Sequence, residues 1–337
     1  DSLGFEELWV GEHFSASSEP IASPMMFMAG LIHRTNLSFG TAVINLPNHD
    51  PVVVSAEAAQ FDHMSRGRFM LGVGAGGLLS DHELFGNGDL AVRTRRLMEF
   101  IDTIGRIWAQ DPPYDIAGEF RPVRIKEAII PSLGIGYMAK PFQKGGPPIS
   151  ISIASPNSGS ARTAAQHGWG MVSANLVPTY SVASHWQIYA KTCAELGRIP
   201  RGENWRVGRN ILIAPTDDAA EERLLAEKSS NRYFFTYLRE VLGRVGQLVV
   251  LKPRPDMPDA EATVEAITRA CVLYGSPRTV LDKLVAFREQ VGPFGSLLMT
   301  GLDWAGANEA WERETMQIMA RDVMPKFRQH ALATAAE

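Results

Sequence analysis

Residues that could bind a ligand or move a proton follow short apolar segments at several points of this sequence. The most informative segment is 66–86, RGRFMLGVGAGGLLSDHELFG. Its apolar run, residues 69–73, leads into a set of glycines: Gly72, Gly74, Gly76 and Gly77. Polar residues follow at once: Ser80, Asp81, His82 and Glu83. Glycines let a backbone turn sharply and let a flat ligand approach, so the segment predicts a ligand site where a strand ends in an α/β protein.

One motif in this segment is also typical of dinucleotide-binding domains. Gly72, Gly74 and Gly77 satisfy G-x-G-x-x-G, the dinucleotide-binding pattern. That pattern requires a helix beginning at the third glycine and a second strand within about 30 residues. Residues 78–88 have the composition of a loop, and the next strand pattern begins near residue 148. The context therefore argues against a dinucleotide-binding domain.

Two further candidates follow the first two predicted strands. His13 could exchange a proton near neutral pH or donate a hydrogen bond to a ligand. The alternative is a partly buried histidine whose partner is Glu12 or a main-chain carbonyl. Asn45 could offer a hydrogen-bond donor and an acceptor to the edge of a ligand ring. The alternative is that Asn45 and the polar residues after it form only a turn and a helix cap before Pro51.

The segment 155–160, SPNSGS, could hold a phosphate. Its small polar residues are Ser155, Asn157, Ser158 and Ser160. At the start of a helix such residues leave free N–H groups that attract anions, although simple capping of the helix is the alternative. Arginines at 93, 95 and 96 open another predicted helix, where they form a solvated face or indicate an anionic partner.

Strand and helix patterns alternate along nearly the whole chain. Strands are predicted at residues 8–10, 37–44, 68–73, 149–154, 171–174, 206–214 and 296–300. Helices are predicted at residues 20–34, 51–64, 91–109, 158–167, 179–196, 219–242, 260–273, 277–290 and 308–329. Irregular excursions are expected at about 111–146 and 231–258, the second richest in proline over residues 249–258.

This alternation predicts an α/β protein with a parallel sheet. A doubly wound sheet and a (β/α)₈ TIM barrel both fit the pattern. The barrel is favoured because seven strands, with a first strand missing before Asp1, make eight. We expect residues 1–337 to form a single barrel domain with the two excursions as insertions. The ligand site should then lie just after the strands.

Composition excludes several other classes of protein. The 337 residues are 45% hydrophobic and 21% charged, with a net charge of -4 that offers no basic surface for nucleic acid. Cys193 and Cys271 lack the spacing of a zinc site, and no metal is expected. No apolar run reaches membrane-spanning length and no signal peptide is recognisable, so a cytoplasmic protein is predicted. Motifs typical of hydrolases, zinc proteases and P-loop nucleotide-triphosphatases do not occur.

Several segments, in order, resemble the bacterial luciferase-like flavin monooxygenases. They are GFEELWVGEHFS, LSFGTAVINLPNHDP, FDHMSRGRFMLGVGAGGLLSDHELFG, PISISIASPNSGSARTAAQHGWG and the ending GSPRTVLDKLVAFREQVG…DVMPKF. The resemblance implies a barrel that begins one strand earlier than this chain. It also implies reduced FMN, delivered by a separate flavin reductase, which reacts with O₂ to a flavin hydroperoxide that oxygenates a mostly apolar substrate.

The resemblance also assigns roles to individual residues. His13 matches the catalytic histidine beside the reactive part of the flavin. Ala42 and Val43 fall where members of the family have a non-proline cis peptide under the flavin ring, near Asn45. The remaining cofactor-binding positions lie along the flavin tail or at its phosphate: Gly74, Ala75, Gly76, Arg95, Ser155, Asn157, Ser158 and Ser160. Ala75 replaces an arginine of luciferase, so light emission from a long aldehyde is not expected.

The turn LPNHDP and the segment ASPNSGSAR resemble the limonene and diketocamphane monooxygenase branch. That branch implies a terpene-like ketone, alkene or aldehyde as substrate, in an apolar pocket formed by Leu46, Leu78, Leu79 and Phe85. The two excursions would serve as lids, and a homodimer is expected. Two alternatives remain: an oxidoreductase that uses a deazaflavin on the same barrel, and a flavin-binding subunit without activity.

Overall fold

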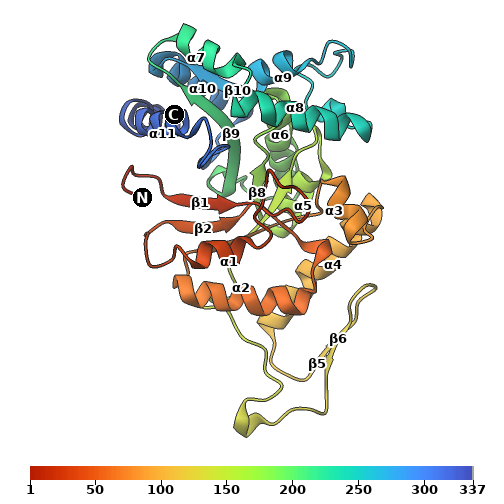
Figure 1. The fold of residues 1–337 in the computed structure, drawn as a ribbon. Helices are drawn as coiled ribbons and strands as arrows, with labels where there is room; N and C mark the ends of the chain where they lie inside the picture. The colour runs from red at the N-terminus through yellow and green to blue at the C-terminus, as the bar shows by residue number, and fades with distance from the viewer. Residues whose placement is uncertain (336–337) are drawn as a thin grey trace. The chain divides into compact units, whose positions relative to one another are not determined.

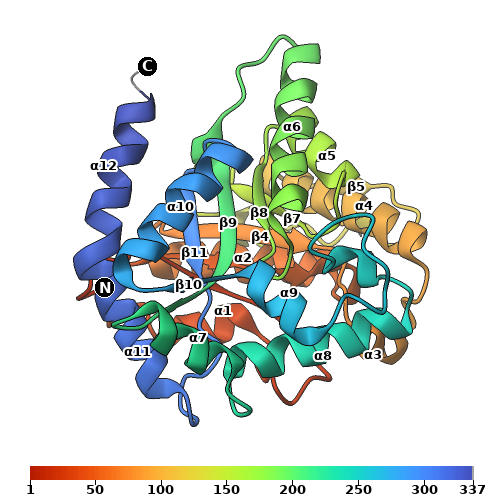
Figure 2. The ribbon, with the colours of Figure 1, turned by 90° about the horizontal axis from the view of Figure 1, so that it is seen from above.

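The computed structural model describes residues 1–335, and these form an α/β protein in which parallel strands alternate with helices (Figures 1 and 2). The chain divides into two compact units. The first unit comprises Asp1 and Glu6–Ser152, and the second comprises Ser2–Phe5 and the residues from Ile153 onward. The predicted α/β class is confirmed, and most predicted strands and helices are present.

The first unit contains the earlier parallel strands of the chain. Strands β1 (Glu7–Val10), β2 (Ser38–Thr41), β4 (Phe69–Gly74) and β7 (Ile149–Ile153) pair in that order, and β3 (Ile44–Asn45) also pairs with β4. All of these pairs are parallel. Because the strands point the same way, the residues that follow β1, β3 and β4 lie at one edge of the sheet.

Four helices accompany these strands: α1 (Pro24–Ala29), α2 (Pro51–Ser65), α3 (Leu79–Leu84) and α4 (Leu90–Ala109). Asp50 caps α2 by accepting from the Val52 N–H at 2.8 Å, and Asp89 caps α4 in the same way. A short 3₁₀ turn, Leu46–Asn48, joins β3 to α2. Asp50 followed by proline thus gives the helix start that the sequence predicts.

The excursion of the first unit is a hairpin and loop that extend beyond α2 in Figure 1. Strands β5 (Tyr114–Ile116) and β6 (Val123–Ile125) are antiparallel, and a 3₁₀ turn follows at Pro131–Leu133. Glu99 of α4 fastens the hairpin, because its carboxylate accepts from three successive main-chain N–H groups, those of residues 119–121, at 2.7 to 3.1 Å. Within the range 111–146, which the sequence predicts to be an excursion, the structure thus has a short antiparallel hairpin and a 3₁₀ turn.

The second unit contains β8 (Gly170–Ser173), β9 (Trp205–Ile213), β10 (Val272–Gly275) and β11 (Ser296–Met299). The long strand β9 pairs in parallel with the other three. Its helices are α5 (Gly159–His167), α6 (Thr179–Glu195), α7 (Asp217–Leu225), α8 (Ser230–Arg244), α9 (Val264–Cys271), α10 (Pro277–Val291), α11 (Glu309–Ile318) and α12 (Met324–Ala335). Short turns occur at Gly202–Asn204 and Leu248–Val250, and a π-helical turn at Met319–Val323 joins α11 to α12 (Figure 2).

Two predictions in the first unit are wrong. The helix predicted at 20–34 is only α1, because proline begins it at Pro24 and the helix ends before Gly30. Residues 78–88 are not all loop, since α3 occupies Leu79–Leu84. No side chain caps α3 and it has only six residues, so the sequence carries no start signal for it.

Three corrections apply to the second unit. The helix predicted at 219–242 is two helices, because Ser229 caps a new start by accepting from the Arg232 N–H. The helix predicted at 260–273 ends at Cys271, and the missed strand β10 follows because its main chain pairs in parallel with that of β9. The excursion predicted at 231–258 is also shorter, since residues up to Arg244 belong to α8.

The described residues were also compared with the requirements of a membrane-spanning helix and of a metal site. None of the helices within residues 1–335 has both the length and the low polarity needed to cross a bilayer. These residues also contain no group of three or more His, Cys, Asp and Glu side chains arranged to share a metal ion.

Candidate functional site

His13 lies just after β1, and carboxylates contact both of its ring nitrogens. Nε2 is 2.9 Å from Glu19 Oε2, and Nδ1 is 3.4 Å from Asp81 Oδ2. Glu19 is about one third exposed, with 36% of its side-chain surface accessible, whereas Asp81 is buried. An imidazole in such a position can hold a proton or give one to a neighbouring molecule.

Asp81 is held in place by residues that follow β1. Its carboxylate accepts from Ser15 Oγ at 2.5 Å and from the Phe14 main-chain N–H at 3.3 Å. Ser15 Oγ also lies 2.7 Å from Ser80 Oγ. Asp81 belongs to α3, so the short helix that the sequence did not predict brings this carboxylate to the histidine.

The electrostatics favour the charged form of His13. Burial alone would lower the pKa of His13, but the hydrogen bonds and charges of Glu19 and Asp81 outweigh it and raise the pKa above 6.5. His82, also on α3, behaves in the opposite way. Burial, with a contribution from Arg93, lowers the pKa of His82, and its Nε2 is buried without a hydrogen-bond partner within residues 1–335.

A second carboxylate, Glu12, organises the end of β3. It is buried and accepts from the Asn45 N–H at 3.0 Å, and its other oxygen lies 2.9 Å from His49 Nε2. The Asn45 side chain donates to the Glu12 main-chain oxygen at 3.0 Å. The Asn45 amide nitrogen therefore uses one of its two N–H donors within the protein.

The peptide bond between Ala42 and Val43 is cis, as the resemblance implies. Beside it, β4 reaches its end at Gly74, where an added Cβ would lie 2.7 Å from Val43 Cγ2 and 2.5 Å from Ser152 Oγ. Only glycine therefore fits at this position without displacing Val43. Ala75 and Gly76 follow directly, and Gly76 has a positive φ of 80°.

In the second unit, the predicted phosphate-binding residues lie at the start of α5. Ser158 is the capping residue and accepts from the Ser160 N–H at 3.3 Å. Asn157 has a positive φ of 54°, and its main-chain N–H donates to Ser184 Oγ at 2.9 Å. The carbonyl of Ser155 accepts from His185 Nε2 at 3.0 Å. These residues shape an exposed helix start, and their role at a phosphate stays a prediction.

Arg95, the remaining predicted phosphate contact, has an acidic partner within the first unit. It lies on α4, is more than half exposed, and forms a 3.1 Å ion pair with Glu119. Its guanidinium also lies over the Phe120 ring. Whether it leaves Glu119 for a phosphate is not tested by these contacts, so this role also stays a prediction.

The predicted pocket residues differ in exposure. Leu46 and Leu78 are buried, whereas Leu79 and Phe85 are exposed, Leu79 by 49%. Of the four, Phe85 lines a measurable pocket in the first unit, together with His49, Arg96 and Phe120. That pocket has a volume of about 310 Å³.

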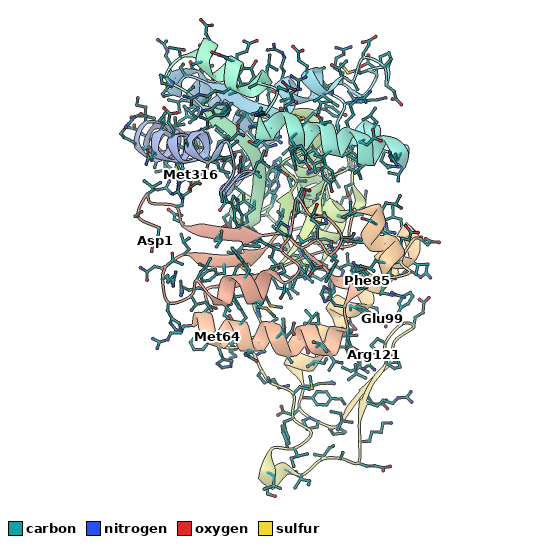
Figure 3. The ribbon with its side chains drawn as sticks, in the orientation of Figure 1. Asp1, Met64, Phe85, Glu99, Arg121 and Met316 are labelled. Carbon is teal, nitrogen blue, oxygen red and sulfur yellow. The ribbon has the colours of Figure 1, made fainter. Side chains whose placement is uncertain are left out.

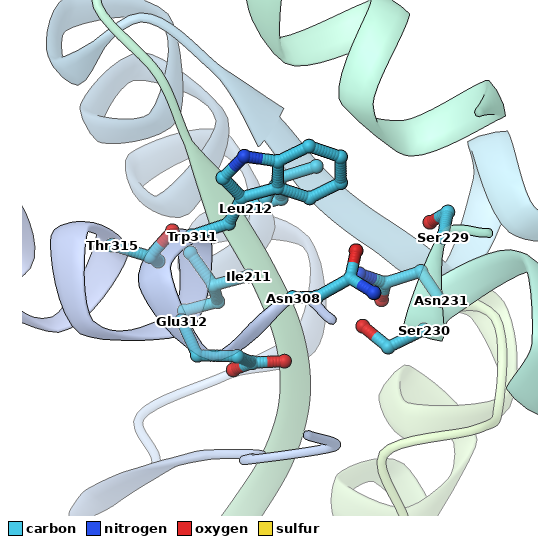
Figure 4. A pocket seen from close by; sticks show the side chains of 9 residues that line it. All are labelled: Ile211, Leu212, Ser229, Ser230, Asn231, Asn308, Trp311, Glu312 and Thr315. Atoms are coloured by element: carbon cyan, nitrogen blue, oxygen red, sulfur yellow. The ribbon is translucent and has the colours of Figure 1, made fainter. Parts of the chain in front are cut away.

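A second, much smaller cavity of about 10 Å³ lies within the second unit (Figure 4). Its polar lining includes Asn231, Asn308 and Glu312. Burial raises the pKa of Glu312 to about 7, although an N–H from Leu302 opposes the shift. The cavity holds at most one water molecule, so it is not a substrate site.

Sequence reasoning missed three residues of this arrangement as contributors to the site. Glu19 lies six residues after His13 in an irregular segment, and no spacing rule connects the two. The sequence suggests Glu12 only as a possible partner of His13, and it gives no separate signal for His49. The signal that could have identified Glu12 is its position directly after a strand, since a carboxylate at such a position needs nearby donors.

Comparisons with known proteins show the family to which this chain belongs. Residues 1–293 match the family model described as luciferase-like monooxygenase. The chain is 33% identical to 4-hydroxyprotoasukamycin monooxygenase of Streptomyces nodosus subsp. asukaensis, over 97% of this chain and 84% of that protein. It is 28% identical to limonene 1,2-monooxygenase of Rhodococcus erythropolis, over 97% of this chain and 79% of that protein.

A solved structure of the oxygenating constituent of 3,6-diketocamphane monooxygenase from Pseudomonas putida, in complex with FMN, has the same fold. The TM-score is 0.82 at 23% identity, covering 96% of this chain and 89% of that one. The predicted TIM barrel and the likeness to limonene and diketocamphane monooxygenases are therefore confirmed. The chain belongs to the luciferase-like monooxygenase family and is an oxidoreductase of the monooxygenase class.

Proposed function

We propose that this chain is the oxygenase of a two-component system that uses reduced FMN and O₂. The substrate is a small, mostly apolar molecule such as a terpene-like ketone, alkene or aldehyde, and a separate reductase supplies the reduced FMN. Family membership and the names of the relatives support this proposal. The observation that carries it is the pair of carboxylates on His13, because oxygen transfer needs a positioned proton donor.

The start of α5 fits the phosphate of FMN. An added Cβ at Gly159 would meet nothing within 4 Å, so an anion can approach the main-chain N–H groups there. The bond from Ser160 N–H to Ser158 Oγ is long at 3.3 Å, so this N–H can be shared with a phosphate oxygen. Free N–H groups and the helix dipole both favour an anion at this position. When bound, reduced FMN supplies the electrons that activate O₂.

The chain's own residues would hold and move the proton. Asp81 fixes the ring orientation of His13 by accepting at Nδ1, and the buried hydrogen bonds of Asp81 keep it in place. Glu19 is more exposed and can leave Nε2, which frees the Nε2 proton for the reacting molecule.

Replacing His13 by Asn tests this role. With FMN, a reductase and O₂ labelled with oxygen-18, the wild-type chain should place the label in members of a panel of cyclic ketones and alkenes. His13→Asn should lower this rate by about 10²-fold or more, because general acid catalysis contributes that much. FMN binding, followed by flavin fluorescence, should change little. His33→Asn, at an exposed histidine of the same unit, is the matched control.

Three results would contradict the proposal. Oxygenation by His13→Asn within tenfold of the wild-type rate would exclude His13 as the proton donor. Hydride transfer from a reduced deazaflavin without O₂, combined with no label in any product, would favour the deazaflavin alternative. A chain that binds FMN but supports neither reaction would match the inactive-subunit alternative.

The homodimer and the reductase partnership belong to the same proposal. Exposed apolar side chains on α1 and α2 support a subunit contact: Met26, Val53 and Met64. Light scattering of the purified chain should give twice its mass of 37.0 kDa. A monomer at micromolar concentration would contradict the dimer without affecting the proposed chemistry.

A further inference from the structure

The first unit contains an open pocket whose lining does not include His13, Glu19 or Asp81. Six residues characterise it: Asn48, Phe85, Arg96, Phe100, Phe120 and Arg121. They come from the turn after β3, from α4 and the segment before it, and from the hairpin excursion. The volume of about 310 Å³ suits a ligand with one or two rings.

Two arginines give this pocket an excess of positive charge. Arg96 donates through Nη1 to Asn87 Oδ1 at 2.5 Å, and Arg121 donates through Nε to Asp50 Oδ2 at 2.6 Å. Asp50 is the one acidic residue among the described lining residues. Within residues 1–335, neither Nη2 group has an acceptor, and the buried Nε of Arg96 also lacks one. Each guanidinium therefore has one nitrogen bonded to a neighbouring side chain and an Nη2 group that can donate to a ligand.

The hairpin holds the aromatic and charged rim in place. Glu99 accepts from the main-chain N–H groups of Phe120 and Arg121, and an added Cβ at Gly118 would lie only 2.4 Å from Glu99 Oε1. The guanidinium of Arg96 lies 5.0 Å from the centre of the Phe120 ring. Figure 3 labels Phe85, Glu99 and Arg121, which gather on one side of the first unit. The rim is thus fixed before a ligand arrives.

The pocket adjoins the His13 group but does not include it. Phe14, the residue after His13, has its ring 4.8 Å from the Phe85 ring and 5.8 Å from the His49 ring. Both of these rings line the pocket. The aromatic residue that follows His13 in the sequence therefore lies close to two rings of the pocket lining.

We propose that this pocket binds a planar aromatic carboxylate. The ring system lies among Phe85, Phe100 and Phe120, and the carboxylate accepts from the Nη2 groups of Arg96 and Arg121. Guanidinium–carboxylate hydrogen bonds are among the strongest in proteins, and aromatic walls favour a flat apolar body. A neutral hydrocarbon would fill the space but leave both donors without acceptors. This site goes beyond the proposed oxygenase function and does not depend on FMN.

Calorimetric titration of the flavin-free chain tests the proposal with two probes of the same shape. They are 2-naphthoate and the neutral 2-naphthylmethanol. Naphthoate should bind at least about tenfold more tightly, because hydrogen bonds to charged groups contribute more than neutral ones. Its affinity should also fall as salt is added, since both arginines are partly exposed to solvent.

Arginine variants locate the bound probe. Arg121→Gln should weaken naphthoate binding by about tenfold or more, with little effect on the neutral probe. The control is Arg124→Gln, which alters an exposed arginine on β6 outside the pocket and should leave affinity within about twofold. Arg96→Gln should act like Arg121→Gln, and circular dichroism shows whether this more buried variant folds.

Three outcomes would overturn the proposal: no naphthoate binding at millimolar concentration, equal binding of both probes, or equal effects of Arg121→Gln and Arg124→Gln. If Arg96→Gln does not fold, the affinity of Arg121→Gln for naphthoate still tests the proposal. Because the titration contains no flavin, no oxygenation can occur in it, and its result is separate from that of the oxygenation assay.

Discussion

Replacing Asp81 by Asn should destabilise the first unit much more than replacing Glu19 by Gln. Both carboxylates contact His13, but their surroundings differ. Asp81 is buried, and besides His13 it accepts from Ser15 Oγ and from the Phe14 N–H. An asparagine at position 81 has only one side-chain oxygen to accept from these donors. Its NH₂ group would face those donors that the oxygen does not reach.

The expected magnitude follows from those contacts. Losing at least one hydrogen bond to a charged acceptor costs about 1.5–3 kcal/mol, and a donor left buried without a partner adds to this. We expect Asp81→Asn to lower the free energy of unfolding by about 2–4 kcal/mol. Glu19→Gln breaks a partly exposed pair and should cost about 1 kcal/mol.

Urea denaturation followed by tryptophan fluorescence measures both values. The dependence of the free energy of unfolding on urea concentration should keep the same slope, and the urea midpoint should fall. A double-mutant cycle with His13→Asn separates the contributions, because the Ser15 and Phe14 donors remain when the histidine is gone. The cost of Asp81→Asn should then persist within about 0.5–1 kcal/mol. Equal costs for Asp81→Asn and Glu19→Gln, or loss of the Asp81 effect in the His13→Asn background, would refute this reasoning.

Three more predictions concern the second unit. Burial lowers the pKa of His185 to about 4, although the Ser155 carbonyl opposes this, so the unfolded chain takes up the proton first as the pH falls. Stability should therefore decline between pH 6.5 and 4, by up to about 3 kcal/mol, and His185→Gln should flatten that part of a urea midpoint–pH profile; an unchanged profile would contradict the assignment. Burial raises the pKa of the Cys271 thiol to about 12, so iodoacetamide at pH 7.5 should label it only in urea, and labelling in the native chain would contradict its burial. Ser160→Asp should weaken FMN binding by about tenfold or more through repulsion of the phosphate, while riboflavin binding and the Thr163→Asp control change little; equal loss for both flavins would remove the phosphate from this helix start.

The scaffold was predictable because its signals are local. The aspartate–proline start of α2, the capping Ser158 and the closing Gly168 of α5 each mark a helix end in the sequence. The apolar runs before Gly74 and Ser155 mark strands in the same way. The cis peptide at Ala42–Val43 came from family resemblance, since no local pattern specifies it.

The parts that were missed depend on contacts between distant residues. β10 has only four residues after a helix, and its pairing with β9 decides its conformation. Glu19 reaches His13 through an irregular segment, and Asp81 reaches it from a helix that has no capping side chain. The pocket beside Arg96 forms only when the hairpin folds back to α4. Secondary-structure propensity and hydrophobic periodicity depend on residues close together in the sequence, so they do not predict contacts between distant residues.

The attachment of the hairpin to Glu99 has a consequence for how this protein can change. The carboxylate grips main-chain amides, which every residue type except proline provides. Side chains at 119–121 can therefore be exchanged without releasing the hairpin, whereas loss of Glu99 would free all three positions together. The attachment of the hairpin through Glu99 therefore does not depend on which side chains the hairpin carries. Substitutions at residues 119–121 can change the preference for a ligand while the strands and helices stay unaltered.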